Sequence, residues 1–587
     1  MTPQLSRCLT LFVIALSLVH VSLPDLLRCT IIIMFHYYNH IRLPKYLRTE
    51  ARTGSHNINE IMRIRCFSVA DFLKICLCLL VSHVLSLNLT DINIPEAHLP
   101  YYFNAFPQIA KECAEDENCS YKQYLDTDKC WGYEPDCKPL NAYSMPYCPG
   151  DHKGWVKTKK AQVETFYSQG DFGYVKEQFS EMSVMCEPLF FDDTFLECSK
   201  YLRFCRGRNI MINFTDLLTR GDNLRYKMDI LNPGQIGGYC KFYQERLMKE
   251  AEHVSPLQSW APEMKNFESI PRRPIRDGLC DVIIEKPTYI MKIDATVNMY
   301  HHFCDFFNLY TSLHVNSTHP SLFSKDNHIL IWETFTYDSA FKETWKAFTN
   351  NPVWDLKTFR GEVVCFKNVV FPLLPRMIFG LFYNTPIIYG CEKSGLFHAF
   401  STHILNGLNI VKHERQNRKI RITLLSRETK YRKILNEDDL LNALNETGEF
   451  QVKRAVYNRN IPFSQQLSIT HNTDIFIGMH GAGLTHLLFL PDWAVIFELY
   501  NCEDSGCYFD LARLRGVKYI TWEKKDKLFQ EDAGHHPDGG AHPKFTNFAF
   551  DVEEFLRLVR VAADHVNSQQ LFHQFLNSST PKEHDEL

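Results

Sequence analysis

The stretch 474–491 most constrains how this chain can fold. An apolar run at 475–477 ends in three closely spaced glycines, Gly478, Gly481 and Gly483, and a leucine-rich segment then continues to the end of the stretch. A short apolar run, a cluster of glycines and a longer apolar segment are typical of a strand, a turn and a helix. The sequence therefore predicts a strand that enters a helix through a glycine turn.

Such a turn can bind a phosphorylated ligand. Glycines let the backbone approach a ligand, and the first N–H groups of a helix, at the positive end of its dipole, favour phosphate oxygens. Glycines also occur at strand-to-helix turns for packing alone, and that alternative stays open on the glycines themselves. His480 and His486 favour a binding site, because polar rings beside such a turn have little reason to pack there. We expect the ligand to contact His480, Gly481, Ala482, Gly483 and Thr485.

Strands alternate with helices through the C-terminal half of the chain. The pattern predicts strands at 281–287, 289–293, 328–332, 363–366, 419–425, 450–452, 475–477, 495–500 and 517–521, and helices at 298–310, 340–348 and 436–444. Alternation of this kind indicates parallel, doubly wound sheets. We therefore expect an α/β fold with two Rossmann-like domains, 280–414 and 415–566, and a ligand cleft at the carboxyl ends of the strands.

A cysteine-rich region, 88–279, precedes these domains. Fifteen of the 20 cysteines lie beyond residue 87, at 113, 119, 130, 137, 148, 186, 198, 205, 240, 280, 304, 365, 391, 502 and 507. Short spacings such as Cys113 to Cys119 and Cys130 to Cys137 favour disulfides, although a close pair can also bind zinc. An odd count leaves at least one thiol unpaired or bonded between chains. We expect a loop-rich region stapled by disulfides.

Two apolar segments, 8–23 and 72–87, lie before the cysteine-rich region. The second follows a basic stretch that starts at Met62, and it ends in small residues, which is the layout of a signal peptide at 62–87. It is too short to indicate a membrane span. Residues 1–61 would then be an upstream extension, with a membrane anchor in the first segment as the alternative.

The C-terminus carries a localisation signal. In the tail at 567–587, the last four residues, His584, Asp585, Glu586 and Leu587, form a tetrapeptide of the kind that a KDEL-type retrieval receptor recognises. Signal peptide and tetrapeptide together predict the lumen of the endoplasmic reticulum, where disulfides persist. Six sequons fit a glycosylated surface, at Asn88, Asn118, Asn213, Asn316, Asn445 and Asn577. The net charge of −4 does not indicate nucleic acid as a partner.

Charged side chains near the strand ends extend the expected ligand site. Arg427 follows the strand at 419–425, and Arg432 lies five residues further on. Together with the N–H groups of the glycine turn, these guanidinium groups could neutralise a leaving diphosphate without a metal. Glu498 ends the next strand, where it could accept hydrogen bonds from ribose hydroxyl groups. The alternative for the two arginines is a solvated basic patch.

The predicted helix at 298–310 carries candidates for a general base. His301 and Asp305 share a face at a spacing of four residues, and His302 lies within the same turn. A histidine oriented by a carboxylate can accept the proton of an acceptor hydroxyl. We expect His301 or His302, oriented by Asp305, to be this base. The alternative is that the histidines are satisfied core residues.

Three segments, 301–310, 425–437 and 478–486, together resemble the glycosyltransferase family that includes plant xylosyl- and arabinosyltransferases. Within that family, segments 130–133 and 501–504 and the C-terminal tetrapeptide look like the members that modify EGF-like repeats. The resemblance covers roughly residues 95–587. It implies a GT-B-like fold, with 280–414 on the acceptor side and 415–566 on the nucleotide-sugar side.

The resemblance also implies an activity. It implies inverting transfer of N-acetylglucosamine from UDP-N-acetylglucosamine, the donor, to Ser or Thr of folded EGF-like repeats. The partners would be secreted and membrane proteins with such repeats, for example Notch-type receptors and matrix proteins. A rival hypothesis of a different class is a lumenal lectin or chaperone that keeps the fold but only binds glycoproteins.

One departure from the family pattern leaves metal use open. Members of the group carry an Asp-Tyr-Asp triplet where this chain has Asn350, Asn351 and Pro352. A divalent cation such as manganese therefore lacks carboxylate ligands at this point of the chain. The remaining Asp-x-Asp after the signal peptide, Asp126 to Asp128, lies in the cysteine-rich region, where we expect it on the surface. We therefore assign no metal ligand.

Overall fold

The computed structural model describes residues 92–125, 127–149, 156–252, 255–316, 323–376 and 390–579. The predicted extension at 1–61, the signal peptide at 62–87, Asn88, Asp126 and the tetrapeptide at 584–587 lie outside these ranges. No helix within the ranges combines the length and the apolar character needed to cross a membrane.

Short helices and turns make up the first part of the described chain. They are η3 (Glu96–His98), α4 (Leu99–Ala105), α5 (Pro107–Glu115), η4 (Lys122–Tyr124), η5 (Pro139–Asn141), α6 (Lys159–Gly170) and α7 (Phe172–Ser180). Trp131 lies fully buried among aromatic rings, including those of His98 and Phe172. Trp131 also packs against His314, so aromatic packing joins this loop-rich segment to the core of the first sheet.

Disulfides staple this region, as the cysteine spacing predicts. The described pairs are Cys113–Cys119, Cys130–Cys137, Cys148–Cys391, Cys186–Cys240, Cys198–Cys205 and Cys280–Cys365. The close pairs are bonded to each other and so are not zinc ligands. Among the cysteines of the described ranges, Cys304, Cys502 and Cys507 are free, which agrees with the odd count.

The first sheet has eleven strands, in the order β10-β9-β8-β11-β3-β2-β1-β5, with β4, β6 and β7 off this path. Its strands are β1 (Ser183–Glu187), β2 (Phe195–Cys198), β3 (Cys205–Asn213), β4 (Ile236–Gly238), β5 (Lys241–Phe242), β6 (Phe267–Ser269), β7 (Val282–Ile284), β8 (Thr288–Met291), β9 (His328–Ile331), β10 (Trp354–Asp355) and β11 (Val363–Phe371). Around them lie η6 (Lys200–Leu202), η7 (Thr215–Leu218), α8 (Gln244–Glu250), α9 (Ala261–Met264), α10 (Met299–Val315), η9 (Lys342–Ala347), η10 (Leu356–Phe359) and α11 (Gly395–Gly407).

The expected domain boundary at residue 280 falls inside this sheet. The antiparallel ladder between β3 and β11 runs from Val363 opposite Asn213 to Phe371 opposite Cys205. Strands β7, β8 and β9 are parallel to their neighbours, as predicted. However, β7 and β8 pair with β11, and β11 pairs in turn with β3 of the cysteine-rich region. The ranges 88–279 and 280–414 therefore build one mixed sheet. The helix expected at 340–348 is the 3-10 helix η9.

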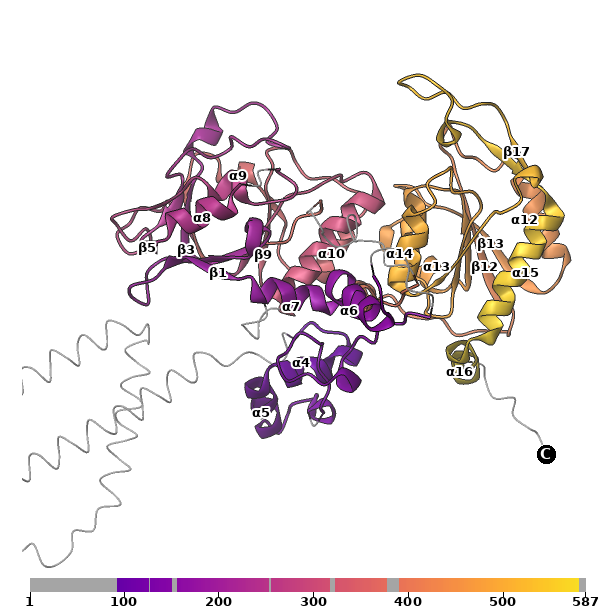
Figure 1. Cartoon of the computed structure of the whole chain (residues 1–587), viewed down its shortest axis with the longest axis horizontal. Helices are drawn as coiled ribbons and strands as arrows, with labels where there is room; N and C mark the ends of the chain where they lie inside the picture. The colour runs from indigo at the N-terminus through magenta and orange to yellow at the C-terminus, as the bar shows by residue number, and fades with distance from the viewer. Residues whose placement is uncertain are drawn as a thin grey trace, which may run out of the picture. The chain divides into compact units, whose positions relative to one another are not determined.

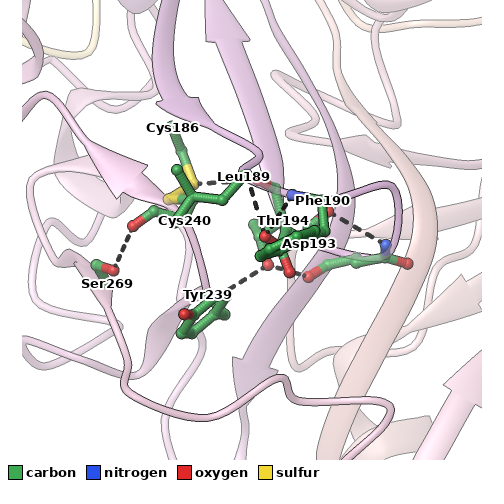
Figure 2. The surroundings of a disulfide bond; sticks show 9 residues. Cys186, Leu189, Phe190, Asp193, Thr194, Tyr239, Cys240 and Ser269 are labelled. Atoms are coloured by element: carbon green, nitrogen blue, oxygen red, sulfur yellow. Dashed lines mark hydrogen bonds between the residues drawn. A yellow bond between two sulfur atoms is a disulfide. The ribbon is translucent and has the colours of Figure 1, made fainter.

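Figure 2 shows how the connection between β1 and β2 is fixed. The disulfide Cys186–Cys240 ties β1 to the segment beside β5. Asp193 is buried and accepts hydrogen bonds from the N–H groups of Leu189 (3.0 Å) and Phe190 (2.8 Å). A buried carboxylate that satisfies two loop N–H groups stabilises the turn, because those donors would otherwise lie unpaired.

The second sheet is entirely parallel, with the order β13-β12-β14-β15-β16. Its strands are β12 (Ile420–Ser426), β13 (Phe450–Val456), β14 (Ile475–Gly478), β15 (Val495–Glu498) and β16 (Lys518–Thr521). The order is that of a doubly wound sheet. β13 is added on one side of β12, and β14, β15 and β16 are added on the other side, so the strand order reverses between β12 and β14. The expected Rossmann-like domain at 415–566 thus corresponds to this sheet and its helices.

Helices cover both faces of this sheet. They are α12 (Glu437–Glu446), α13 (Phe463–His471), η11 (Ala482–Phe489), α14 (Cys507–Arg515), α15 (Val552–Ser568) and α16 (Gln570–Ser579). Figure 1 shows α12 and α15 on one face of β12 and β13, and α13 and α14 on the other. The face with α12 and α15 has its own core, whereas the face with η11 shares a continuous core with α10.

A hairpin follows the second sheet. It consists of η12 (Lys525–Lys527), β17 (Leu528–Gln530), η13 (Pro543–Phe545) and β18 (Phe548–Phe550). The connection between its strands carries His535, His536 and His542. Its C-terminal part lies against the loop after β12, where Arg432 N–H donates to the carbonyl of Thr546 at 2.7 Å. The hairpin is therefore positioned next to the carboxyl end of the sheet.

Candidate functional site

A cavity of about 680 Å³ lies at the carboxyl end of the parallel sheet. It is lined by Arg427, Arg432, His480, Gly481 and Ala482 from this sheet, by Asn298, Tyr300 and His301 from α10, and by Asp504, Cys507, Tyr508 and Lys544, among others. The cavity thus brings together residues of the predicted diphosphate site and of the predicted general base. Its position at the carboxyl end of a doubly wound sheet is where ligands bind in such folds.

The cavity opens at the switch point of the sheet. Strands β12 and β14 are neighbours, with Leu425 opposite Gly478, and each ends at the cavity. Arg427 therefore follows one strand while the glycine turn follows the other. At this point successive connections leave on opposite faces of the sheet, so the strand ends form a crevice.

Two arginines converge on the glycine turn. Arg427 Nη1 lies 3.4 Å and Arg432 Nη1 lies 3.0 Å from the carbonyl oxygen of His480. Gly481 adopts φ +148°, and a Cβ atom there would lie 2.4 Å from Arg427 Nη1. Glycine is therefore required at this position, both for its backbone conformation and for the approach of the guanidinium group.

Two cations close together favour an anionic ligand. Burial, together with the charge of Arg432, lowers the pKa of Arg427 to about 10. Because each charge destabilises the other, an anion that binds between them gains interactions with both. Both arginines are half-buried and line the cavity, which favours a binding site over a solvated basic patch.

The glycine turn leads into a 3-10 helix, η11, rather than the expected α-helix. Ala482 lines the cavity, but Thr485 lies buried beneath the turn. Gly483 packs against Leu425, because a Cβ atom at Gly483 would lie 2.8 Å from that side chain. Packing therefore accounts for this glycine, whereas ligand approach accounts for Gly481.

His486 is a core residue, in contrast to the prediction. Its Nδ1 donates to the carbonyl oxygen of Gly483 at 2.9 Å, and its ring lies 4.5 Å from that of Tyr457. Burial lowers its pKa to about 4. The ring is thus neutral and packed, and it supports the turn from below.

Glu498 orients His480 instead of facing the cavity. Its Oε1 lies 2.8 Å from His480 Nδ1, and its Oε2 accepts a hydrogen bond from the hydroxyl group of Tyr519. The carboxylate is fully buried and does not line the cavity. The position of Glu498 therefore contradicts the expectation that it accepts hydrogen bonds from ribose hydroxyl groups. On the opposite side of the ring, Asp504 Oδ2 lies 3.8 Å from Nε2, which is beyond hydrogen-bond distance.

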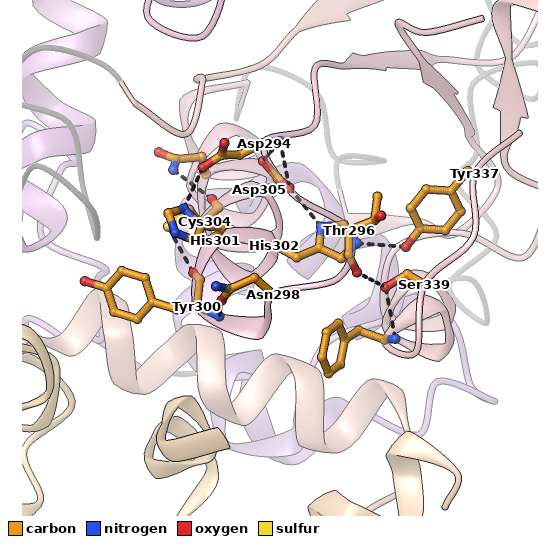
Figure 3. Close-up of polar contacts among 12 residues, drawn as sticks. Asp294, Thr296, Asn298, Tyr300, His301, His302, Cys304, Asp305, Tyr337 and Ser339 are labelled. Carbon is orange, nitrogen blue, oxygen red and sulfur yellow. Dashed lines mark hydrogen bonds and ion pairs between the residues drawn. The ribbon is translucent and has the colours of Figure 1, made fainter. Parts of the chain in front are cut away.

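The adjacent histidines His301 and His302 of α10 point away from each other, as Figure 3 shows. His301 lines the cavity, and its Nδ1 lies 2.8 Å from Asp294 Oδ2. Asp294 also accepts from Arg376 Nε at 2.9 Å. Burial raises the pKa of Asp294, but the hydrogen bonds and charges of His301 and Arg376 outweigh it and hold this pKa below its usual value. Asp294 is therefore a carboxylate that orients His301.

His302 and Asp305 form a separate, buried pair. His302 Nδ1 lies 2.8 Å from Asp305 Oδ2, and its Nε2 lies 2.8 Å from the hydroxyl oxygen of Tyr337. Burial lowers the pKa of His302 to about 3. Neither residue lines the cavity. Of the two expected pairings, His302 with Asp305 is present, whereas Asp305 does not pair with His301, whose partner is Asp294.

The sequence analysis missed Asp294, which orients His301 without lining the cavity, and it missed further residues that do line the cavity. Asp294 follows strand β8, and its position at a carboxyl strand end is a signal that could have identified it. Asp504, Tyr508 and Lys544 come from loops and from α14, and their residue types gave no such signal. The cavity therefore contains more charged groups than the predicted set.

The residues that replace the Asp triplet lie away from the cavity. Asn350 is exposed, and Asn351 donates from Nδ2 to the carbonyl oxygen of Asn327 at 2.7 Å. Within the described ranges, the one group of side chains close enough to hold a metal is Cys130, Glu134 and Cys137, and its two cysteines form a disulfide.

The sequons differ in exposure. Asn118, Asn445 and Asn577 are exposed, whereas Asn213 and Asn316 are half-buried. The Oδ1 atom of Asn213 accepts hydrogen bonds from the backbone and hydroxyl group of Thr215. Among the described sequons, the three exposed ones are therefore the most accessible to modification.

Comparison with known proteins defines the class of this site. Residues 299–497 match the family model described as Glycosyltransferase 61. The chain is 56% identical over 481 residues to the EGF domain-specific O-linked N-acetylglucosamine transferase of Drosophila melanogaster, covering 82% of this chain and 92% of that protein.

Vertebrate proteins of the same name are similar. The protein from Bos taurus is 49% identical over 504 residues, 85% of this chain and 93% of its own length, and that from Xenopus laevis is 51% identical over 484 residues, 82% and 91%. The chain therefore belongs to the family of EGF domain-specific O-linked N-acetylglucosamine transferases, a group of glycosyltransferases. Membership implies a nucleotide-sugar donor.

Proposed function

We propose that this chain transfers N-acetylglucosamine from UDP-N-acetylglucosamine to a Ser or Thr hydroxyl group of folded EGF-like repeats. The names of the relatives support the sugar and the acceptor. The observation that carries the proposal is that one cavity contains Arg427 and Arg432 as well as His301. A pair of cations for a diphosphate and a base for a hydroxyl group are the two requirements of this reaction.

The donor diphosphate binds between Arg427 and Arg432, against the N–H groups of the turn at Gly481 and Ala482. Charge-assisted hydrogen bonds from the guanidinium groups strengthen as the bond to the sugar breaks, because negative charge then gathers on the leaving UDP. His480, fixed by Glu498, supplies the carbonyl oxygen that holds both arginines in position.

The transfer itself is a single displacement. The acceptor oxygen forms a bond to the anomeric carbon while the bond from that carbon to the diphosphate oxygen breaks, and the electron pair leaves with UDP. The proton of the hydroxyl group passes to His301 at Nε2, the ring nitrogen that is not turned to Asp294. Direct displacement at one carbon inverts its configuration.

Metal ions take no part in this scheme. In this structure Asp504 is paired with Lys544 at 3.0 Å, and Asp510 is paired with Arg513 at 2.8 Å. The scheme assigns neither carboxylate to a divalent cation and relies on the arginines to neutralise the leaving diphosphate. Whether Mn²⁺ stimulates the enzyme is decided by assay with and without a chelator.

The proposed location is the lumen of the endoplasmic reticulum, and the proposed partners are secreted and membrane proteins with EGF-like repeats, together with a KDEL-type receptor. The C-terminal tetrapeptide supports this location. The six disulfides also support it, since such bonds persist in an oxidising compartment.

One experiment tests the activity. The purified lumenal chain is incubated with a folded EGF repeat and a panel of UDP-sugars, and the repeat is examined by mass spectrometry. We expect one N-acetylhexosamine to be added with UDP-N-acetylglucosamine and much less product with other donors. No mass increase with any donor would favour the lectin or chaperone hypothesis instead.

A further inference from the structure

The cavity contains a third cation that the proposed mechanism does not use. Lys544 lines it together with Arg427 and Arg432. Its Nζ lies 3.0 Å from Asp504 Oδ2, and about a third of the side chain is exposed, 32%. A half-exposed lysine at the wall of an anion site can reach a ligand, because its long side chain keeps rotational freedom.

Backbone hydrogen bonds hold Lys544 next to Arg432. The segment after Lys544 runs alongside the loop that follows β12: Arg432 N–H donates to Thr546, and Leu435 N–H donates to Phe548, both at 2.7 Å. Phe548 N–H returns a bond to Lys433 at 3.0 Å. The position of the lysine is thus coupled to that of the arginine by main-chain contacts rather than by flexible side chains.

Ring packing reinforces this coupling. The ring of Phe545, next to Lys544, packs edge to face on that of Tyr431, next to Arg432, at 5.6 Å. Burial raises the pKa of the Cys502 thiol to about 12, and the charges of Arg432, Lys544 and Arg427 oppose this rise. Ring packing and main-chain hydrogen bonds therefore both hold the segment of Lys544 beside that of Arg432.

Asp504 holds Lys544 through an unusual turn. Cys502 and Glu503, the two residues before it, both adopt left-handed backbone conformations, with φ of 50° and 65°. Neither is glycine, so each of the two residues carries backbone strain in this conformation. Such strain persists where the surrounding structure requires it, and here it aims a carboxylate at Lys544 and His480.

We propose that Lys544 is a third cation for the donor diphosphate and that Asp504 is its partner only while the site is empty. This inference rests on the proposed function. On binding, the ammonium group exchanges the carboxylate of Asp504 for diphosphate oxygens. The exchange keeps the lysine neutralised in both states, and it prevents the empty site from presenting three uncompensated charges.

Binding of UDP and of uridine to the full chain, measured by calorimetry, tests the role of Lys544. Uridine lacks the diphosphate, so Lys544→Met should weaken UDP about tenfold or more, as expected for a lost charge-assisted bond, and leave uridine unchanged. The matched control is Lys527→Met, because Lys527 has the same exposure, 33%, and a similar ion pair, with Asp551 at 3.0 Å, but does not line the cavity.

Asp504→Asn tests the exchange. If Asp504 competes with the diphosphate, Lys544→Met should weaken UDP by a larger factor in the Asp504→Asn background than in the wild type. An equal or smaller factor would overturn the exchange, since Asp504 would then only position the lysine.

Two further outcomes distinguish a failure of this inference from a failure of the proposed donor site. If Arg427→Ala weakens UDP but Lys544→Met does not, or if Lys544→Met weakens uridine equally, this inference fails while the donor site stands. If the wild type binds UDP no better than uridine, the proposed donor site itself fails.

Discussion

His301 Nδ1 lies 2.8 Å from Asp294 Oδ2, across the junction between α10 and the loop after β8. The contact fixes the imidazole on the cavity side of the helix, while His302, the next residue, turns into the core. Neighbouring residues on a helix point about 100° apart, so the helix can present one histidine to substrate and bury the other. Two adjacent residues of the same type therefore have different surroundings, and the proposed function gives them different roles.

Replacement of each histidine should separate these functions. His301→Ala should lower the rate of transfer by about a hundredfold or more, because general base catalysis contributes that much, while UDP still binds. Calorimetry with UDP and rates of EGF-repeat modification measure both quantities. His302→Ala should instead lower the free energy of unfolding. Full transfer by His301→Ala would remove the base assignment.

Arg427→Ala should weaken both donor binding and turnover. The bonds that its guanidinium group donates strengthen as UDP leaves, so the expected loss is about 2–4 kcal/mol, or two to three decades in kcat/KM. Arg418→Ala is the control, since Arg418 is exposed just before β12, at the opposite end of the strand. A soluble, disulfide-intact Arg427→Ala protein with normal turnover would contradict the phosphate assignment.

Gly481→Ala should disable the donor site without unfolding the chain. The added Cβ would meet Arg427 Nη1 at 2.4 Å, and the flexible guanidinium group would move away from the turn. We expect UDP affinity to fall about tenfold, comparable to the loss of one charge-assisted bond. Gly448→Ala is a matched control with φ +68° and open space around it, so it strains the backbone but spares binding. Equal losses in both variants would assign the effect to backbone strain.

Stability should fall as the pH is lowered from about 6.5. Burial lowers the pKa of His302, His314 and His403 to about 3 and that of His471 to about 4. Each has a usual value near 6.5 in the unfolded chain, so the unfolded state binds more protons between these values. The stabilisation is complete above pH 6.5 and decreases by up to about 1.4 kcal/mol per pH unit for each histidine.

Denaturant unfolding at pH 7.5 and pH 5.5 measures this dependence. His403→Leu should reduce the average slope between these two pH values by about half a proton, because a histidine with a pKa near 6.5 in the unfolded chain titrates midway between them. Ala347 keeps its hydrogen bond from Asn93 Nδ2 in this variant. The exposed His573 should not affect the slope when replaced by alanine. An unchanged slope in His403→Leu would contradict the lowered pKa of this ring.

The centre of the second sheet could be predicted because β14 and β15 are short apolar runs next to turn residues. Parallel strands are buried on both faces, so the local pattern alone identifies them. The expected strands at 419–425 and 495–500 correspond closely to β12 and β15. The arginines and the glycine turn could be placed in one site because both follow such strands.

The first sheet and the histidine pairing could not be predicted in the same way. Strand β3 pairs with β11 far along the chain, and pairing over such a separation leaves no local signal. The helical period associates His301 with Asp305, but the actual partner, Asp294, lies before the helix. Contacts between a helix and a loop depend on the packing of the helix, which its own sequence does not specify.

Strand β11 lies between β8 and β3, and this limits how the protein can be divided. The matched family segment at 299–497 contains β11 but neither neighbour, and it ends within β15, before β16. Expressed alone, it would expose both edges of β11, and bare strand edges are templates for aggregation. The shortest fragment that retains both sheets complete extends from Ser183 to Thr521. The segment by which the family is recognised is therefore smaller than the unit that can fold.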